Sequence, residues 1–237
     1  MRVIALGDSI SCGEGVGLRL APALTWPARL AAALPDAQLQ VLAAPGARVR
    51  DVLRCQAPQV ATLRPDLITL LIGLNDVSRA GFKADCFEAD LQAVLALLRP
   101  TGAHILLGRL PKPGQHLPLP PALRRTVLAR AAAVNAAVDR AAGTAVVDVS
   151  AVPGLRLRRA WEVDRLHPNA AGHALLAEAA AQVLRRGGLS VGPVQTSPLP
   201  PAPGRAREAR WLLRAGLPWL VRHVPQVLAP AVLASVR

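Results

Sequence analysis

The chain of 237 residues is poor in aromatic side chains, which make up only 3% of it. Proteins that bind single-stranded nucleic acid stack the bases on aromatic rings placed among basic residues. Here the net charge of +13 comes from arginines scattered along expected helices, without interleaved aromatics. We therefore do not expect nucleic acid as a partner, nor an aromatic platform dedicated to sugars.

Cysteine is also scarce, because Cys12, Cys55 and Cys86 are the only three and lie far apart. An odd number without a Cys-x-x-Cys pair excludes the common zinc and redox motifs, and buried free thiols are expected instead. Three histidines lack acidic or cysteine partners at metal-ligand spacing: His104, His116 and His223. We expect neither a metal nor a diffusible cofactor.

Apolar residues make up 52% of the sequence, so a chain of this length can bury the core of one domain plus an extension. The first apolar run begins at Val3, which leaves no room for a cleavable leader. We expect a cytoplasmic protein.

Short apolar runs alternate with segments of helical periodicity along the chain. The runs predict strands at residues 3–6, 38–43, 66–72, 103–107 and 145–149. The segments between them predict helices at 26–34, from about 48, at 85–98, 122–142 and 169–184. This alternation is typical of right-handed βαβ units, so we expect a five-stranded parallel sheet with helices on both faces.

Several of the predicted strands are followed, at their carboxyl ends, by a polar residue or a glycine. Ser9 follows the first, Gly46 the second and Asn75 the third, and the loop after the fifth carries Asp164 and His167. In a parallel sheet ligands meet the loops at the carboxyl ends of the strands. Residues far apart in sequence are therefore expected to converge at one edge of the sheet.

The residue types at this edge match the needs of nucleophilic catalysis by serine. A serine hydroxyl is a weak nucleophile until a neighbouring histidine takes its proton, and the histidine needs an acceptor that orients it. Attack on an ester carbonyl creates an oxyanion, which needs hydrogen-bond donors already in place. The Ser9 and Gly46 N–H groups and the Asn75 side chain are candidate donors.

Four short motifs follow one another along the chain: Gly7-Asp8-Ser9-Ile10, Gly46, Gly73-Leu74-Asn75-Asp76 and Asp164-x-x-His167-Pro168. Together they resemble the four sequence blocks of the SGNH hydrolases, also called the GDSL esterase/lipase family, with isoleucine in place of leucine at position 10. The resemblance covers roughly residues 1 to 186. It implies a three-layer α/β/α sandwich with a five-stranded parallel sheet, the flavodoxin-like SGNH hydrolase fold. It also implies that Ser9 is the nucleophile, His167 the base and Asp164 its orienting partner, with Ser9, Gly46 and Asn75 forming the oxyanion hole.

On these grounds we expect a serine esterase that hydrolyses small carboxylic esters with short acyl groups through an acyl-enzyme on Ser9. One alternative is an acyltransferase that passes the same acyl group to an alcohol instead of water. An alternative from a different class is a membrane- or nucleic-acid-binding module in which the basic tail is the function. The set of Ser9, Asn75, Asp164 and His167 argues against this module, because binding alone does not need it.

Two other motifs are set aside, and three further residues are not expected to take part in the chemistry. The glycines of Gly13-Glu14-Gly15-Val16-Gly17 lack the third glycine of a dinucleotide fingerprint, and no Gly-x-Ser-x-Gly elbow is present. We expect Asp76 to hold its loop by hydrogen bonds, His173 to pack or face solvent, and Arg165 to be a solvated charge.

Composition changes after the last expected helix. Residues 1–187 are expected to form the hydrolase domain and 188–204, rich in proline, a linker. Residues 205–237 form a basic amphipathic extension, whose arginines and apolar anchors are Arg207, Arg210, Arg214, Trp211, Leu212, Trp219 and Leu220. It is no membrane span, because charges and prolines interrupt it: Arg214, Pro218, Arg222, His223 and Pro225. Either it lies on an anionic membrane surface as a peripheral contact, or it packs on the domain or in a dimer.

Overall fold

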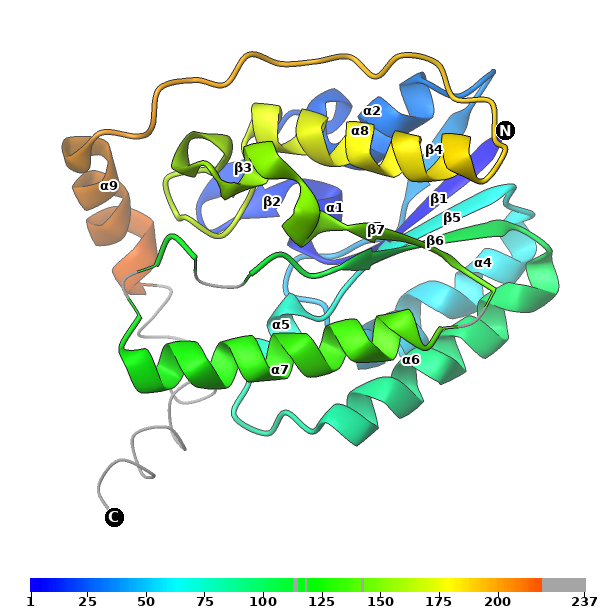
Figure 1. Ribbon diagram of the computed structural model, residues 1–237, viewed down its shortest axis with the longest axis horizontal. Coiled ribbons are helices and arrows are strands. Elements are labelled where there is room, and N and C mark those ends of the chain that lie inside the picture. The colour runs from blue at the N-terminus through cyan, green and yellow to red at the C-terminus, as the bar shows by residue number, and fades with distance from the viewer. Residues whose placement is uncertain (113–114, 118, 142, 219–237) are drawn as a thin grey trace.

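The computed structural model describes residues 1–112, 115–117, 119–141 and 143–218 (Figure 1). Its centre is a parallel sheet of β1 (Arg2–Gly7), β4 (Gln38–Val41), β5 (Leu67–Leu71), β6 (His104–Arg109) and β7 (Ala145–Asp148). The strand order is β4-β1-β5-β6-β7, and all neighbours run parallel. This is the doubly wound order of flavodoxin-like folds, so the predicted five-stranded sheet is confirmed.

Helices cover both faces of the sheet, as the predicted three-layer sandwich requires. On one face lie α2 (Trp26–Ala32) and α8 (Ala170–Arg186), and on the other α4 (Ala57–Leu63), α6 (Ala84–Leu98) and α7 (Pro121–Asp139) (Figure 1). Shorter helices are α1 (Ser9–Cys12), α3 (Val49–Asp51), α5 (Leu74–Ser78) and α9 (Arg205–Trp211). Single turns complete the helical structure: the π turns η2 (Val52–Gln56) and η7 (Leu212–Gly216), and the 3-10 turns η1 (Pro22–Leu24), η3 (Arg99–Thr101), η4 (Val149–Ala151), η5 (Pro153–Arg156) and η6 (Arg158–Ala160).

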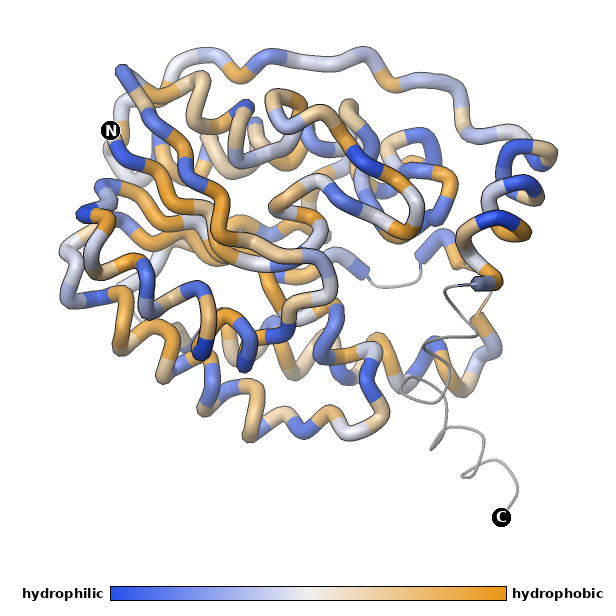
Figure 2. The backbone as a smooth tube through the Cα atoms, turned by 180° about the vertical axis from the view of Figure 1, so that it is seen from behind, coloured by the Kyte–Doolittle hydropathy of each residue, from blue (hydrophilic) through white to orange (hydrophobic). Residues whose placement is uncertain are grey.

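The core lies between the sheet and these two helical layers. Every residue of β5 is buried, which fits a central parallel strand covered on both faces. The central strands β1, β5 and β6 are accordingly the most continuously hydrophobic part of the sheet, whereas the edge strand β4 and the outer helices alternate between apolar and polar residues (Figure 2). On α6 the buried residues follow helical spacing: Phe87, Leu91, Val94, Leu95 and Leu98. No helix among the described residues is both long and apolar enough to cross a membrane.

The end of β1 is fixed by contacts to the backbone of Gly7. Gly7 has φ +131°, and a Cβ at this position would collide with the carbonyl oxygen of Leu71 on β5. The buried Gln56 side chain accepts a hydrogen bond from the Gly7 N–H and donates one to its carbonyl, both at 2.9 Å. The chain therefore leaves the sheet in one direction only, toward Asp8 and Ser9.

Two local expectations from the sequence are wrong. The glycine-rich stretch after Ser9 forms a hairpin of β2 (Glu14–Gly15) and β3 (Leu18–Arg19), where no strand was expected. Cys55 and Cys86 are exposed rather than buried, because they lie on the solvent side of η2 and α6, while Cys12 is half-buried.

Residues 188–204 contain no helix or strand and cross the molecule from α8 to α9 (Figure 1). Two hydrogen bonds from the guanidinium of Arg29 anchor them, to the Gln195 carbonyl and the Ser197 hydroxyl, both at 2.7 Å. Val194, which belongs to this segment, is buried against the core of the domain. The prolines thus keep the segment extended, but side chains of the domain hold it in place.

Helix α9 packs on the loops beyond the sheet. The Trp211 indole donates to the Val16 carbonyl at 2.8 Å, and Glu208 forms ion pairs with Arg158 and Arg165. The described part of the extension therefore contacts the domain, which is one of the two arrangements expected for it. The expected anchors Trp219 and Leu220, with Arg222, His223 and Pro225, lie outside the described residues.

Candidate active site

The structure brings Ser9, His167 and Asp164 into one hydrogen-bonded chain. Ser9 opens α1 directly after β1, whereas the other two lie in the loop that precedes α8. The Ser9 Oγ is 2.9 Å from the His167 Nε2, and the His167 Nδ1 is 2.6 Å from the Asp164 Oδ2. Residues 158 positions apart thus meet at the carboxyl end of the sheet.

The loop itself orients the Asp164 carboxylate. Its Oδ1 accepts hydrogen bonds from the backbone N–H groups of Leu166, at 2.9 Å, and His167, at 3.0 Å. Arg165 adopts φ +62°, an uncommon conformation for a residue other than glycine, and this tightens the turn between the two partners. The second oxygen, Oδ2, is left to face the imidazole.

The carboxylate and the imidazole shift each other's pKa in opposite directions. Burial disfavours the charged form of both groups, but their mutual hydrogen bond and attraction outweigh it. The pKa of Asp164 is consequently lowered and that of His167 is raised above 6.5. Asp164 therefore stays ionised and stabilises a proton on His167.

The candidate oxyanion donors lie on three neighbouring segments. The Asn75 side chain donates to the Ala47 carbonyl at 3.0 Å, beside Gly46, and approaches the Asp8 carboxylate at 3.4 Å, beside Ser9. Within the part of the chain that the structure describes, neither the Ser9 N–H nor the Gly46 N–H donates a hydrogen bond. Both N–H groups are therefore available to an external acceptor.

Asp8 also contributes to the site, although the sequence did not reveal its role. Its carboxylate is 1% exposed, accepts from the Ile10 N–H at 3.0 Å, and faces the Asn75 amide with its other oxygen. Burial raises the pKa of Asp8 to about 6. The residue links the turn that carries Ser9 to the helix that carries Asn75.

Gly15 is a second residue whose role the sequence did not reveal, although the glycine-rich stretch around it is conspicuous. It lies in β2, and a Cβ placed on it would be 2.9 Å from the His167 Nδ1 and 3.1 Å from the Asp164 Oδ2. Only a residue without a side chain lets the hairpin approach the His167–Asp164 pair this closely.

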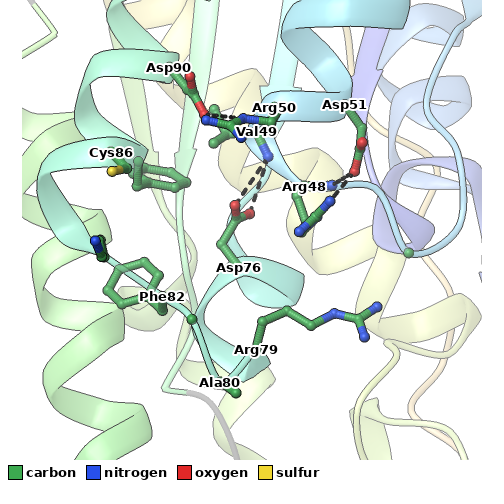
Figure 3. Close-up of a pocket in the computed structure, with 14 residues that line it drawn as sticks. Arg48, Val49, Arg50, Asp51, Asp76, Arg79, Ala80, Phe82, Cys86 and Asp90 are labelled. Carbon is green, nitrogen blue, oxygen red and sulfur yellow. Dashed lines mark hydrogen bonds and ion pairs between the residues drawn. The ribbon is translucent and has the colours of Figure 1, made fainter. Parts of the chain in front are cut away.

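Asp76 holds the loop that carries Gly46, as its position suggested. Its carboxylate accepts from the Val49 N–H at 3.2 Å, and burial raises its pKa to about 6. Figure 3 shows this bond from α5 to α3 in a pocket of about 590 Å³ that Gly46 also lines. A smaller pocket of about 190 Å³ is lined by Ser9 and His167.

Two nearby basic residues have structural surroundings. His173 is buried, its Nδ1 accepts from the Trp26 N–H at 3.0 Å, and burial lowers its pKa to about 3. The expectation that Arg165 is a solvated charge is wrong, because the packing of α9 places Glu208 against it. Among the described residues no cluster of side chains could hold a metal ion.

Comparison with known proteins identifies relatives of this arrangement. The sequence model of the GDSL-like Lipase/Acylhydrolase family matches residues 5–175. Axe2, an acetylxylan esterase from Geobacillus stearothermophilus, is 25% identical with a TM-score of 0.58 over 77% of this chain and 93% of its own. No curated protein matches.

Two further solved structures share the fold. TesA is 23% identical, with a TM-score of 0.59 over 78% of this chain and 99% of its own. LAE5, an alpha/beta hydrolase from the metagenome of Lake Arreo, Spain, is 24% identical, with a TM-score of 0.60 over 77% of this chain and 94% of its own. All three structures are thus covered over nearly their whole length.

Replacing Gly15 with alanine is expected to lower kcat for p-nitrophenyl acetate by about 10- to 100-fold, because the new methyl group displaces His167 from Ser9. Gly204→Ala is the matched control, since a Cβ at Gly204 meets nothing within 4 Å and this glycine lines neither pocket. Initial rates and circular dichroism of both variants make the comparison. Equal rates for the two variants would show that the hairpin does not constrain the imidazole.

The raised pKa of His167 predicts the acid limb of the pH profile. A base must be neutral, so kcat/KM should rise with pH through a midpoint above 6.5. Asp164→Asn removes the charge that raises this pKa, so the midpoint should move to lower pH and kcat should fall by about 10⁴-fold. Asp139→Asn, at an exposed carboxylate in an ion pair with Arg109, should leave the midpoint in place. A midpoint that Asp164→Asn does not move would contradict this assignment.

Proposed function

The chain belongs to the GDSL-like lipase/acylhydrolase family, and from this premise we propose that it hydrolyses short-acyl carboxylic esters through an acyl-enzyme on Ser9. The family makes it a serine ester hydrolase of the SGNH type, and residues 1–187 are proposed to form the hydrolase domain that holds all of its catalytic residues. The observation that carries the proposal is the unbroken chain from the Ser9 Oγ through the His167 imidazole to the Asp164 carboxylate.

In the first half of the reaction, the neutral His167 takes the proton of the Ser9 hydroxyl through Nε2. The Ser9 Oγ then attacks the ester carbonyl carbon, and Asp164 stabilises the imidazolium that forms. When the tetrahedral intermediate collapses, the same Nε2 returns the proton to the leaving alcohol. Water, which gives a proton to His167 in turn, then attacks the acyl-enzyme; the bond from the acyl carbon to the Ser9 Oγ breaks, the acid leaves, and His167 returns the proton to the Oγ.

The negative charge of each tetrahedral intermediate needs donors that do not have to reorganise. The N–H groups of Ser9 and Gly46 can supply them, because no other described group accepts from them. Asn75 adds its side-chain amide once the oxyanion competes with the weaker 3.4 Å contact to Asp8. One such donor typically contributes about 10²- to 10³-fold to kcat.

The lining of the two pockets supports a short acyl group. Charged side chains line both pockets: Arg48, Asp51 and Lys83 in the larger, and Arg19, Glu162 and Arg207 in the smaller. A long hydrocarbon chain would have to displace water from these charges, which costs free energy without compensation. An acetyl or similarly small acyl group needs no such apolar channel. The structural neighbour Axe2 is an acetylxylan esterase, which is in keeping with an acyl group of this size.

The proposal is tested by hydrolysis of p-nitrophenyl esters of increasing acyl length. Acetate should be the best substrate and decanoate the poorest, and Ser9→Ala should lower kcat by about 10⁴- to 10⁶-fold. Ser11→Ala is a matched control from the same helix, because the buried Ser11 hydroxyl has no hydrogen-bond partner among the described residues. Full activity of Ser9→Ala would exclude Ser9 as the nucleophile, and a preference for decanoate would refute the short-acyl assignment.

A further inference from the structure

The helix formed by α9 and η7 has two faces of different character. Its inner face carries Glu208, Trp211 and Ala215, spaced three and four residues apart. Trp211 bonds to the Val16 carbonyl, and a Cβ on Gly17 would lie 2.9 Å from Ala215. The domain therefore holds the helix by this side and leaves the opposite side to solvent.

The outer side of α9 and η7 is formed by leucines flanked by arginines, and we name it the Leu-Arg face: Arg210, Leu213, Arg214 and Leu217. Leu213 is 68% exposed, the highest value among the exposed large hydrophobic residues of the described chain. Leu212 beside it is 42% exposed. Leu217 is 43% exposed and lies four positions after Leu213, so these two leucines share the Leu-Arg face, whereas Leu212 lies on the side of Gly216.

The charge of this helix has one sign on the outside. Residues 205–218 contain four arginines and a single glutamate, Glu208. The inward ion pairs with Arg158 and Arg165 engage that glutamate. Arg205, Arg207, Arg210 and Arg214 are all exposed. The Leu-Arg face thus combines insertable apolar side chains with an excess of positive charge.

We propose that the Leu-Arg face docks the enzyme on an anionic lipid surface. Leucines that enter the boundary between headgroups and acyl chains, with arginines at the level of the anionic headgroups, are the pattern of interfacial helices. A helix of two to three turns binds weakly by itself. Here the domain preorganises it through Trp211 and Glu208, so binding does not have to supply the ordering entropy.

The docked helix lies next to the pocket of the proposed reaction. Arg207, on the flank of the same helix, lines the pocket of Ser9 and His167 and lies 3.9 Å from Glu162. Docking would therefore bring the pocket close to the lipid surface. The binding itself does not depend on the proposed hydrolase chemistry.

The test is co-sedimentation of the full chain with vesicles of equal parts phosphatidylglycerol and phosphatidylcholine, against vesicles of phosphatidylcholine alone. We expect binding to the anionic vesicles only. Leu213→Glu and the double variant Arg210→Glu/Arg214→Glu should each weaken binding at least about 10-fold. All variants should still hydrolyse p-nitrophenyl acetate in solution like the wild type, which shows that they fold.

Matched controls place the same changes elsewhere on the surface. Leu97→Glu alters a leucine on α6 that is 43% exposed, and Arg54→Glu/Arg186→Glu reverses two exposed arginines that lie outside α9 and η7. Both controls have the same net charge as the corresponding test variant. They should bind within about twofold of the wild type if the Leu-Arg face, and not total charge, makes the contact.

Several results would overturn the proposal. One is the absence of binding to anionic vesicles at low salt, and another is binding that tracks net charge alone. If only the arginine variant loses binding while Leu213→Glu keeps it, the contact is electrostatic and the leucines do not insert, which contradicts the proposed docking by the Leu-Arg face. If light scattering shows that the wild type is a dimer and Leu213→Glu a monomer, the face is an interface between copies.

Discussion

The position of the nucleophile depends on the backbone of one glycine at the end of the first strand. Gly7 is confined by the carbonyl of Leu71 on the neighbouring strand and by two hydrogen bonds with the buried Gln56 side chain. Because both its N–H and its carbonyl are engaged, the chain has a single exit direction. The turn that follows therefore places the Ser9 hydroxyl 2.9 Å from the imidazole of His167, which lies 158 positions later in the chain.

Around this point the site contains three buried or half-buried acids, which serve two different tasks. Asp164 is kept ionised by hydrogen bonds to its own loop and by the imidazole, so it can stabilise charge on His167. Asp8 and Asp76 have pKa values raised to about 6 by burial, and they hold the segments of Ser9 and Gly46 in position. The desolvation of these carboxylates is thus a cost that maintains the geometry of the site, and such desolvated groups are common near active sites.

Much of the fold follows from the sequence, because period and length of the apolar runs are local properties. All five strands are predictable in this way, and β5, with its five buried residues, is the clearest. The convergence of Ser9, His167 and Asp164 is also predictable, since parallel strands direct their carboxyl ends to one edge. The role of Gly15 is not, because it comes from the close approach of a hairpin too short to show periodicity. The sequence leaves two options for α9, because its docking depends on Glu208 meeting arginines that lie 50 and 43 positions away in the chain.

The measurement that tests the central claim most directly is covalent labelling with a fluorophosphonate, which reacts with a serine only when a base activates it. Intact mass should rise by one adduct per chain, and peptide mapping should place it on Ser9. His167→Ala should label far more slowly although Ser9 is present. A chain that gains no adduct, or gains it on Ser11 or Cys12, would contradict the account, because the hydrogen bond between Ser9 and His167 would then not activate the serine.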